Sequence, residues 1–103
     1  MPEFVRVAGR SDVPENGAIA VVAGDHRIAL FNAGGVFYAI NNACRHLGVP
    51  LSAGKIYGTR VICPWHGWEY DFTTGAMVDD DDPAVRVACF KVKVEGDDVF
   101  IEI

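Results

Sequence analysis

Basic residues are scarce in this chain of 103 residues. Nine lysines and arginines stand against 14 aspartates and glutamates, which gives a formal net charge of −5. A nucleic-acid interface needs a stripe of Lys and Arg to neutralise phosphates, and an anionic membrane surface attracts the same residues. We therefore expect neither nucleic acid nor a membrane as a partner. The acidity can steer association with a basic patch on a partner protein, or it can simply keep the chain soluble.

Long hydrophobic runs are also absent. The longest apolar stretch, residues 17–24, is far shorter than the about 20 residues that cross a bilayer as a helix. The first residues show no basic segment followed by an apolar run, which a secretion signal would need. The three cysteines are an odd set that cannot pair completely. We therefore expect a cytoplasmic protein whose thiols are reduced or bound to metal.

No long stretch has the periodicity of an amphipathic helix, and a helical turn near 49–53 has no capping signal to support it. Short apolar segments alternate with glycine-containing turns, a pattern typical of an all-β domain. The length fits a single domain, residues 1–103, without repeats or a linker. We predict strands at 4–8, 18–23, 27–32, 36–41, 59–62, 68–72, 85–88, 90–95 and 99–103.

Residues 41–72 hold two of the three histidines, two of the three cysteines and both tryptophans. One segment, 44–48, reads Cys-Arg-His-Leu-Gly, and another, 63–68, reads Cys-Pro-Trp-His-Gly-Trp. The candidate ligands are Cys44, His46, Cys63 and His66. Two thiolates and two imidazoles suit a tetrahedral zinc site, or a [2Fe–2S] centre in which two histidines replace two cysteines on one iron. Structural zinc sites usually pair ligands of one kind within one knuckle, whereas each segment here offers one Cys and one His.

The two motifs and their flanks resemble the Rieske family of [2Fe–2S] proteins, and small Rieske ferredoxins in particular. The likeness extends to Leu51-Ser52-x-Gly54, Tyr70-Asp71, Thr74-Gly75 and Val94-Glu95-Gly96-Asp97. It implies an antiparallel β-sandwich base with a small cluster-binding subdomain at about 41–75. It further implies that Cys44 and Cys63 ligate the inner iron, and that His46 and His66 ligate the outer iron and form the port for electron transfer.

The resemblance also implies a function and partners. Ferredoxins of this kind pass single electrons from an NAD(P)H-dependent flavin reductase to a terminal oxygenase, so we expect an electron carrier rather than an enzyme. We expect a monomer, because a shuttle must present its tip to two partners in turn. Two alternatives stay open. The chain could be a small subunit of an NAD(P)H-dependent nitrite reductase-like complex, or a zinc-stapled binding module that transfers no electrons.

The chain departs from the high-potential branch of the family at three positions. That branch has a disulfide-forming cysteine in each loop and a serine that donates a hydrogen bond to a cluster sulfur, whereas this sequence has Val49, Trp65 and Trp68 there. Tyr70 matches a tyrosine found in both branches. Fewer hydrogen bonds to the sulfurs stabilise the reduced cluster less, so we expect a midpoint potential toward the lower end of about −150 to +300 mV.

Three other features have simpler interpretations. Cys89 is predicted to be a small buried side chain, with a redox-active thiol as the alternative. His26 follows Gly24-Asp25 and is predicted to be an exposed turn residue. The four aspartates at 79–82 are predicted to form a solvated loop, with a partner-docking patch as the alternative; their spacing does not fit an EF-hand calcium loop.

Overall fold

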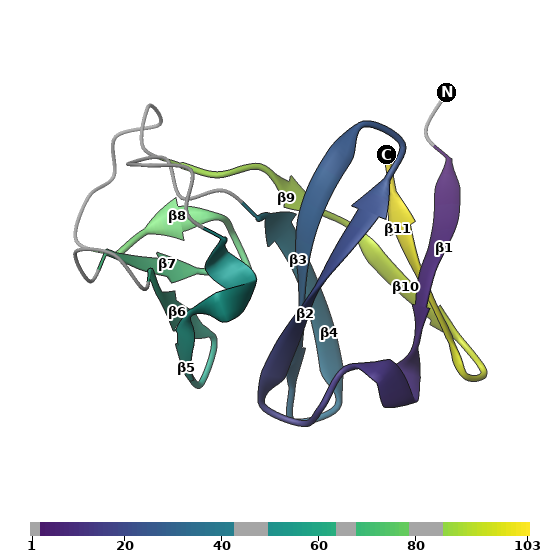
Figure 1. Cartoon of the computed structure of the whole chain (residues 1–103), viewed down its shortest axis with the longest axis horizontal. Helices are drawn as coiled ribbons and strands as arrows, with labels where there is room; N and C mark the ends of the chain where they lie inside the picture. The colour runs from purple at the N-terminus through teal and green to yellow at the C-terminus, as the bar shows by residue number, and fades with distance from the viewer. Residues whose placement is uncertain (1–2, 43–49, 64–67, 79–85) are drawn as a thin grey trace.

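The computed structural model describes residues 3–42, 50–63, 68–78 and 86–103 as three antiparallel sheets (Figure 1). The terminal sheet has the order β1-β11-β10, the central sheet β2-β3-β4-β9 and the small sheet β5-β6-β7-β8. The strands are β1 (Phe4–Gly9), β2 (Gly17–Ala23), β3 (His26–Ala33), β4 (Val36–Asn41), β5 (Lys55–Tyr57), β6 (Arg60–Ile62), β7 (Glu69–Asp71), β8 (Ala76–Met77), β9 (Cys89–Phe90), β10 (Val92–Glu95) and β11 (Asp98–Glu102). Two short 3-10 helices, η1 (Arg10–Asp12) and η2 (Leu51–Ala53), lie between strands.

The central sheet lies between the other two because β3 is apolar on both faces. Ile28 and Leu30 point into a core shared with the terminal sheet, while Ala29 and Phe31 point into a core shared with the small sheet. Side chains alternate across a strand, so one apolar run can serve two layers. Figure 1 shows this order, with the small sheet on the left and the terminal sheet on the right.

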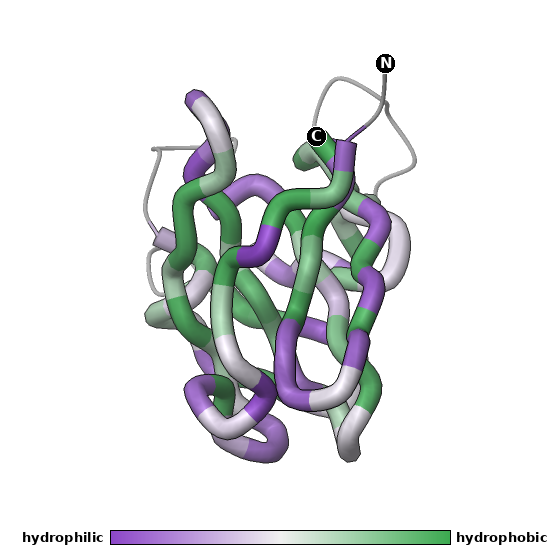
Figure 2. Tube along the Cα trace, turned by 90° about the vertical axis from the view of Figure 1, so that its right-hand side faces the viewer, coloured by the Kyte–Doolittle hydropathy of each residue, from purple (hydrophilic) through white to green (hydrophobic). Residues whose placement is uncertain are grey.

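Two antiparallel hairpins build the main part of the central sheet. β2 and β3 are joined through Gly24 and Asp25, and Ala23 is opposite His26. Gly24 has a φ of +60°, a conformation that costs an L side chain energy and that glycine adopts freely. Figure 2, viewed from the side of the terminal sheet, shows hydrophobic residues concentrated in the strands, where they alternate in places with hydrophilic ones, and hydrophilic residues at the turns.

The ends of the described chain are held together in the terminal sheet. Glu3 and Ile103 exchange two backbone hydrogen bonds, of 3.3 and 3.0 Å, next to the β1–β11 pairing. Among the described residues, none belongs to a helix of the length and apolar character that would cross a bilayer.

The all-β prediction is confirmed, and β4 has the predicted limits of 36–41. Two strand predictions are wrong. The strand predicted at 90–95 is divided, because the chain leaves the central sheet after Phe90 and enters the terminal sheet at Val92. In the segment predicted as a strand at 85–88, residues 86–88 form no strand, and Val85 lies outside the described residues.

Three short elements, β5, β8 and η1, were not predicted from the sequence, whereas η2 lies within the range 49–53 that was considered for a helical turn. His26 is exposed, as predicted, but it is the first residue of β3 rather than part of the turn. Its ring lies edge-on to Phe90, with 5.3 Å between the centroids.

Candidate metal centre

Asn42 closes the base of the chain segment that carries the first motif. Its carbonyl accepts a hydrogen bond from Leu51 N at 2.9 Å, and its side-chain Oδ1 accepts one from Ser52 N at 2.7 Å. Its own N–H donates to the carbonyl of Arg27 in β3 at 3.0 Å. The segment therefore leaves and returns at a fixed point beside the central sheet.

Gly54 brings the end of this first segment against β6. A Cβ at position 54 would overlap the carbonyl of Ile62 and lie 2.8 Å from Cγ2 of Val61 and 3.1 Å from the carbonyl of Leu51. Only glycine leaves the space for this approach. Since Ile62 immediately precedes Cys63, Gly54 sets how closely the bases of the two motifs approach each other.

Cys63 and Trp68 close the base of the second motif. The N–H of Cys63 donates to the carbonyl of Trp68 at 2.6 Å, and β6 and β7 pair directly below them. Cys63 is 2% exposed and belongs to the same core as Leu51 at the base of the first motif. Trp68 packs against that core and is half-buried.

Aromatic packing fixes the small sheet on the central sheet. Phe72, which follows β7, stacks on Phe31 of β3 with 4.3 Å between ring centroids and 6° between the planes. Tyr38 contacts Phe72 at 5.5 Å, and Tyr70 is fully buried in the same core. Such offset aromatic pairs stabilise beyond the apolar area they bury. The strands that carry Cys63 are therefore held rigidly.

Of the four predicted ligands, the structure describes Cys63. Cys44, His46 and His66 lie outside the described residues, as do Val49, Trp65 and the aspartates at 79–82. Within the parts of the chain that the structure describes, no three His, Cys, Asp or Glu side chains gather in a way that could hold a metal ion.

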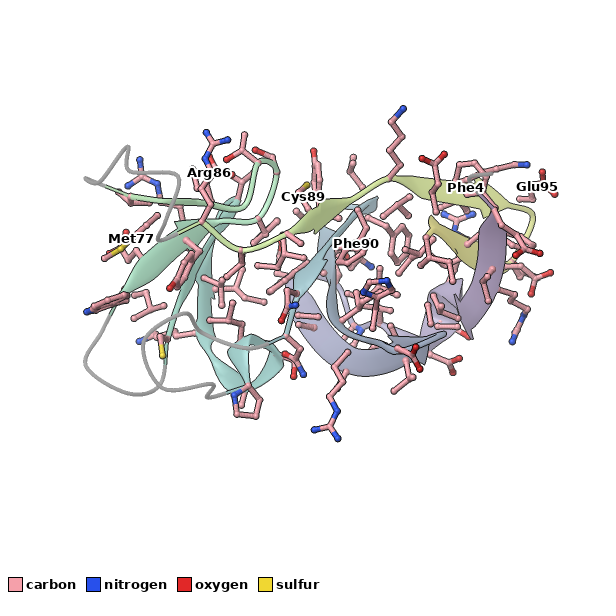
Figure 3. The ribbon with its side chains drawn as sticks, turned by 90° about the horizontal axis from the view of Figure 1, so that it is seen from above. Phe4, Met77, Arg86, Cys89, Phe90 and Glu95 are labelled. Carbon is pink, nitrogen blue, oxygen red and sulfur yellow. The ribbon has the colours of Figure 1, made fainter. Side chains whose placement is uncertain are left out.

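A third chain segment returns to the small sheet through Gly75 and Val87. Val87 N donates to the Gly75 carbonyl at 2.9 Å, and Gly75 has a φ of +80° with no room for a Cβ beside the Val87 carbonyl. On the other side of this segment, Val78 N donates to the carbonyl of Glu69 at 2.8 Å. Figure 3 shows Met77 and Arg86 at the small-sheet end, and Cys89 and Phe90 farther along the connection to the central sheet.

The prediction that Cys89 is buried is wrong, because its side chain is exposed. Val87, two residues earlier, is buried, but Ala88 and Cys89 are both exposed, so strand-like alternation does not continue from Val87 to Cys89. The Cys89 thiol donates to the carbonyl of Thr73 at 3.5 Å. Partial burial of the thiol raises the pKa of Cys89, and the negative charge of Asp71 raises it further.

The described residues are compatible with a [2Fe–2S] cluster. Cys63, the one predicted ligand among them, is 2% exposed at the end of β6, and Asn42 and Gly54 fix the base of the first motif nearby. Two thiolates and two imidazoles are the ligand set of a mixed Cys/His cluster. Sequence reasoning missed Asn42; the tendency of Asn to bond nearby backbone groups was the only available signal. Gly54 was noted only as part of a flanking motif.

Comparisons with known proteins agree with this assignment. Residues 3–91 match the family described as "Rieske [2Fe-2S] domain". The 3-phenylpropionate/cinnamic acid dioxygenase ferredoxin subunits of Escherichia coli (strain K12) and Shigella flexneri serotype 5b (strain 8401) are each 36% identical over 96 residues, which cover 90% of this chain and 87% of the relative.

Solved structures show the same architecture. The ferredoxin of carbazole 1,9a-dioxygenase from Nocardioides aromaticivorans IC177 aligns with a TM-score of 0.85 and 27% identity, over 95% of both chains. A Sphingomonas yanoikuyae B1 ferredoxin aligns with a TM-score of 0.86 and 25% identity, over 98% of this chain and 99% of the other.

Proposed function

The chain belongs to the Rieske [2Fe–2S] domain family, and on that premise we propose that it is a ferredoxin that passes single electrons from an NAD(P)H-dependent flavin reductase to a terminal oxygenase. The observation that carries the proposal is the extent of the match to ferredoxin subunits, 90% of this chain and 87% of the relative.

We propose Cys44, His46, Cys63 and His66 as the ligands of one [2Fe–2S] cluster, held by a subdomain of about residues 41–75 within a single domain, 1–103. When bound, the cluster accepts and releases one electron. Cys63 would hold it from the buried side, since its side chain is 2% exposed. His46 and His66 would supply the exposed side and thus the contact with partners. Together with the sulfides of the cluster, these four side chains would complete the coordination of both irons and would leave no open position for substrate chemistry.

The partners of this chain are proposed from its relatives. The E. coli relative is named as a subunit of an aromatic-acid dioxygenase, and a structural neighbour is titled a complex of oxygenase and ferredoxin. A cytoplasmic location fits a flavin reductase that uses NAD(P)H. One copy of the chain carries one cluster and one electron, so the transfer step needs no second copy.

Electron paramagnetic resonance on the dithionite-reduced protein, prepared anaerobically, tests the proposal. We expect a rhombic signal with the low average g of a mixed Cys/His cluster, and two irons per chain by elemental analysis. A colourless protein that holds zinc would overturn the redox function and favour the zinc-stapled binding module. Reduction by a flavin reductase of a ring-hydroxylating system, followed by reoxidation with its oxygenase, tests the assignment of partners.

A further inference from the structure

Asn42 provides acceptors for the first two N–H groups of η2. The first N–H groups of a helix have no acceptor within the helix, and the residue just before it usually caps them. Here that residue is Pro50, which makes no side-chain cap. Asn42 instead accepts from Leu51 N through its carbonyl and from Ser52 N through Oδ1, at 2.9 and 2.7 Å. η2 is therefore capped from the other end of the segment that carries the first motif.

The backbone around Asn42 is itself held on two sides. The Asn42 N–H donates to the Arg27 carbonyl in β3 at 3.0 Å, and the N–H of Asn41 donates to the Ala88 carbonyl, just before β9, at 2.8 Å. The Asn42 side chain is half-buried. Its Oδ1 therefore extends from a fixed part of the central sheet.

Contacts between described residues lead from Asn42 to the proposed ligand Cys63. Leu51 of η2 is fully buried in the core that also contains Cys63. Gly54 follows η2 and lies so close to β6 that a Cβ there would overlap the carbonyl of Ile62, the residue before Cys63. η2 is therefore packed against the base of the second motif on one side and bonded to Asn42 on the other.

We propose that Asn42 is a positioning residue that sets where the first motif stands relative to the second, and so how Cys44 and His46 meet the cluster. This role rests on the proposed function, and its evidence comes from the described residues on either side of 43–49. A segment whose ends are already joined loses less conformational entropy when its ligands bind.

The side chain of Asn42 can be changed without removing its backbone hydrogen bonds. Asn42→Ala removes the Oδ1 acceptor and leaves the Ser52 N–H without it, in a part-buried contact. Loss of one partner in such a place costs more than the bond contributes on average. Asn42→Asp keeps a side-chain oxygen at the same distance from the backbone. The two variants therefore separate the acceptor from the rest of the residue.

Release of iron from the oxidised, cluster-loaded protein to a chelator, in buffer without denaturant, tests the proposal. Asn42→Ala should lose iron about tenfold faster than the wild type, the factor expected for one such hydrogen bond. Its reduced form should give shifted g values in electron paramagnetic resonance, because His46 would be held differently. Asn42→Asp should release iron at close to the wild-type rate. A residue that only supports the fold would leave the g values unchanged.

Asn32→Ala is the matched control. Asn32 also bonds backbone groups through its side chain, but at the opposite end of β3. Its Oδ1 accepts from Gly35 N at 2.8 Å, and its Nδ2 donates to the Val13 carbonyl at 3.1 Å. The variant should be less stable to urea yet keep the wild-type g values and release rate. If it does not fold, Asp12→Ala replaces it, since this change removes the acceptor of Gly9 N beside η1.

A wild-type release rate or wild-type g values in Asn42→Ala would overturn the proposal, as would equally fast release from the control. So would an Asn42→Asp variant that behaves like Asn42→Ala. If Asn42→Ala takes up no cluster, loading of Asn42→Asp supports the proposal and failure of both variants overturns it. A wild type that holds zinc would refute the electron carrier, and release of zinc would still compare the same variants, so the two proposals can fail separately.

Discussion

Cys63 and Cys89 have the same side chain in opposite surroundings. Cys63 is buried at the base of the second motif, whereas Cys89 is exposed on the connection between two sheets. Because the proposed cluster is held by Cys63 and not by Cys89, we expect Cys63→Ala to lose the iron and the visible colour. Cys89→Ala should retain both and serves as the matched control. Iron content and the visible spectrum are the measurements; a coloured Cys63→Ala protein would contradict the ligand assignment.

The Cys89 thiol is expected to be less reactive than its exposure suggests. Its pKa is raised by burial and by Asp71, so less thiolate, the nucleophilic form, is present at neutral pH. Alkylation with iodoacetamide at pH 7–8, measured on the peptide that contains Cys89, should therefore be slower in the folded than in the unfolded protein. Asp71→Asn keeps an oxygen for the Thr73 hydrogen bonds but removes the charge, and should speed the reaction. An unchanged alkylation rate in Asp71→Asn would mean that burial alone raises the pKa of Cys89.

At the level of single residues, the sequence indicated the ligand types but not the groups that fix their geometry. Cys63 could be proposed as a ligand because a Cys and a His recur in both motifs. The role of Asn42 could not be predicted, because its hydrogen bond with Ser52 joins residues ten positions apart and depends on how the chain folds back beside β3. Cys89 was assigned to the interior because free cysteines are usually buried, and that general tendency does not hold for this exposed first residue of β9.

Gly54 illustrates how elements are held together at the site. A methyl group there would overlap the carbonyl of Ile62, although the φ of −77° suits any residue. We expect Gly54→Ala to destabilise the protein by about 3 kcal/mol through overpacking. Gly58→Ala is the control, because position 58 has open space and only the cost of a positive φ, about 1 kcal/mol.

Urea unfolding, followed by far-UV circular dichroism and by the visible absorbance of the cluster, compares the two glycine variants. Gly54→Ala should also shed the cluster at lower urea concentration than the wild type, since the bases of the two motifs would separate. Equal losses of stability in both variants would show that backbone freedom, not close approach, accounts for the glycine at 54.

Strand prediction succeeded where apolar runs were long. β3 and β4 extend for eight and six residues and are separated by the turn at Gly34-Gly35, so pattern and structure agree. β5 has only three residues, and its pairing with β6 depends on the turn at Gly58, which has a φ of +56°. A three-residue strand carries little periodicity of its own; β6 and β7 are equally short but lie within the apolar segments predicted at 59–62 and 68–72.

For the whole molecule, the midpoint potential is the property that distinguishes a dioxygenase-type ferredoxin from a respiratory Rieske protein. The sequence has Trp68 where a serine hydroxyl would donate to a cluster sulfur, and Val49 and Trp65 where a disulfide would form. We expect a potential near the lower end of about −150 to +300 mV. Trp68→Ser should raise it by supplying a donor. A strongly positive wild-type midpoint in a redox titration would contradict this prediction.

The two ends of the described chain have a practical consequence. Glu3 and Ile103 are bonded to each other in the terminal sheet, on the far side of the central sheet from Cys63 (Figure 1). The molecule measures 36 Å along its longest axis, and the small sheet and the terminal sheet lie at opposite ends of it. A linker, a surface anchor or a fused reductase attached at either end would therefore hold the protein at its terminal sheet. Such a tether would leave the small sheet, whose β6 leads to the proposed ligand Cys63, facing outward, which suits the chain to oriented attachment on an electrode.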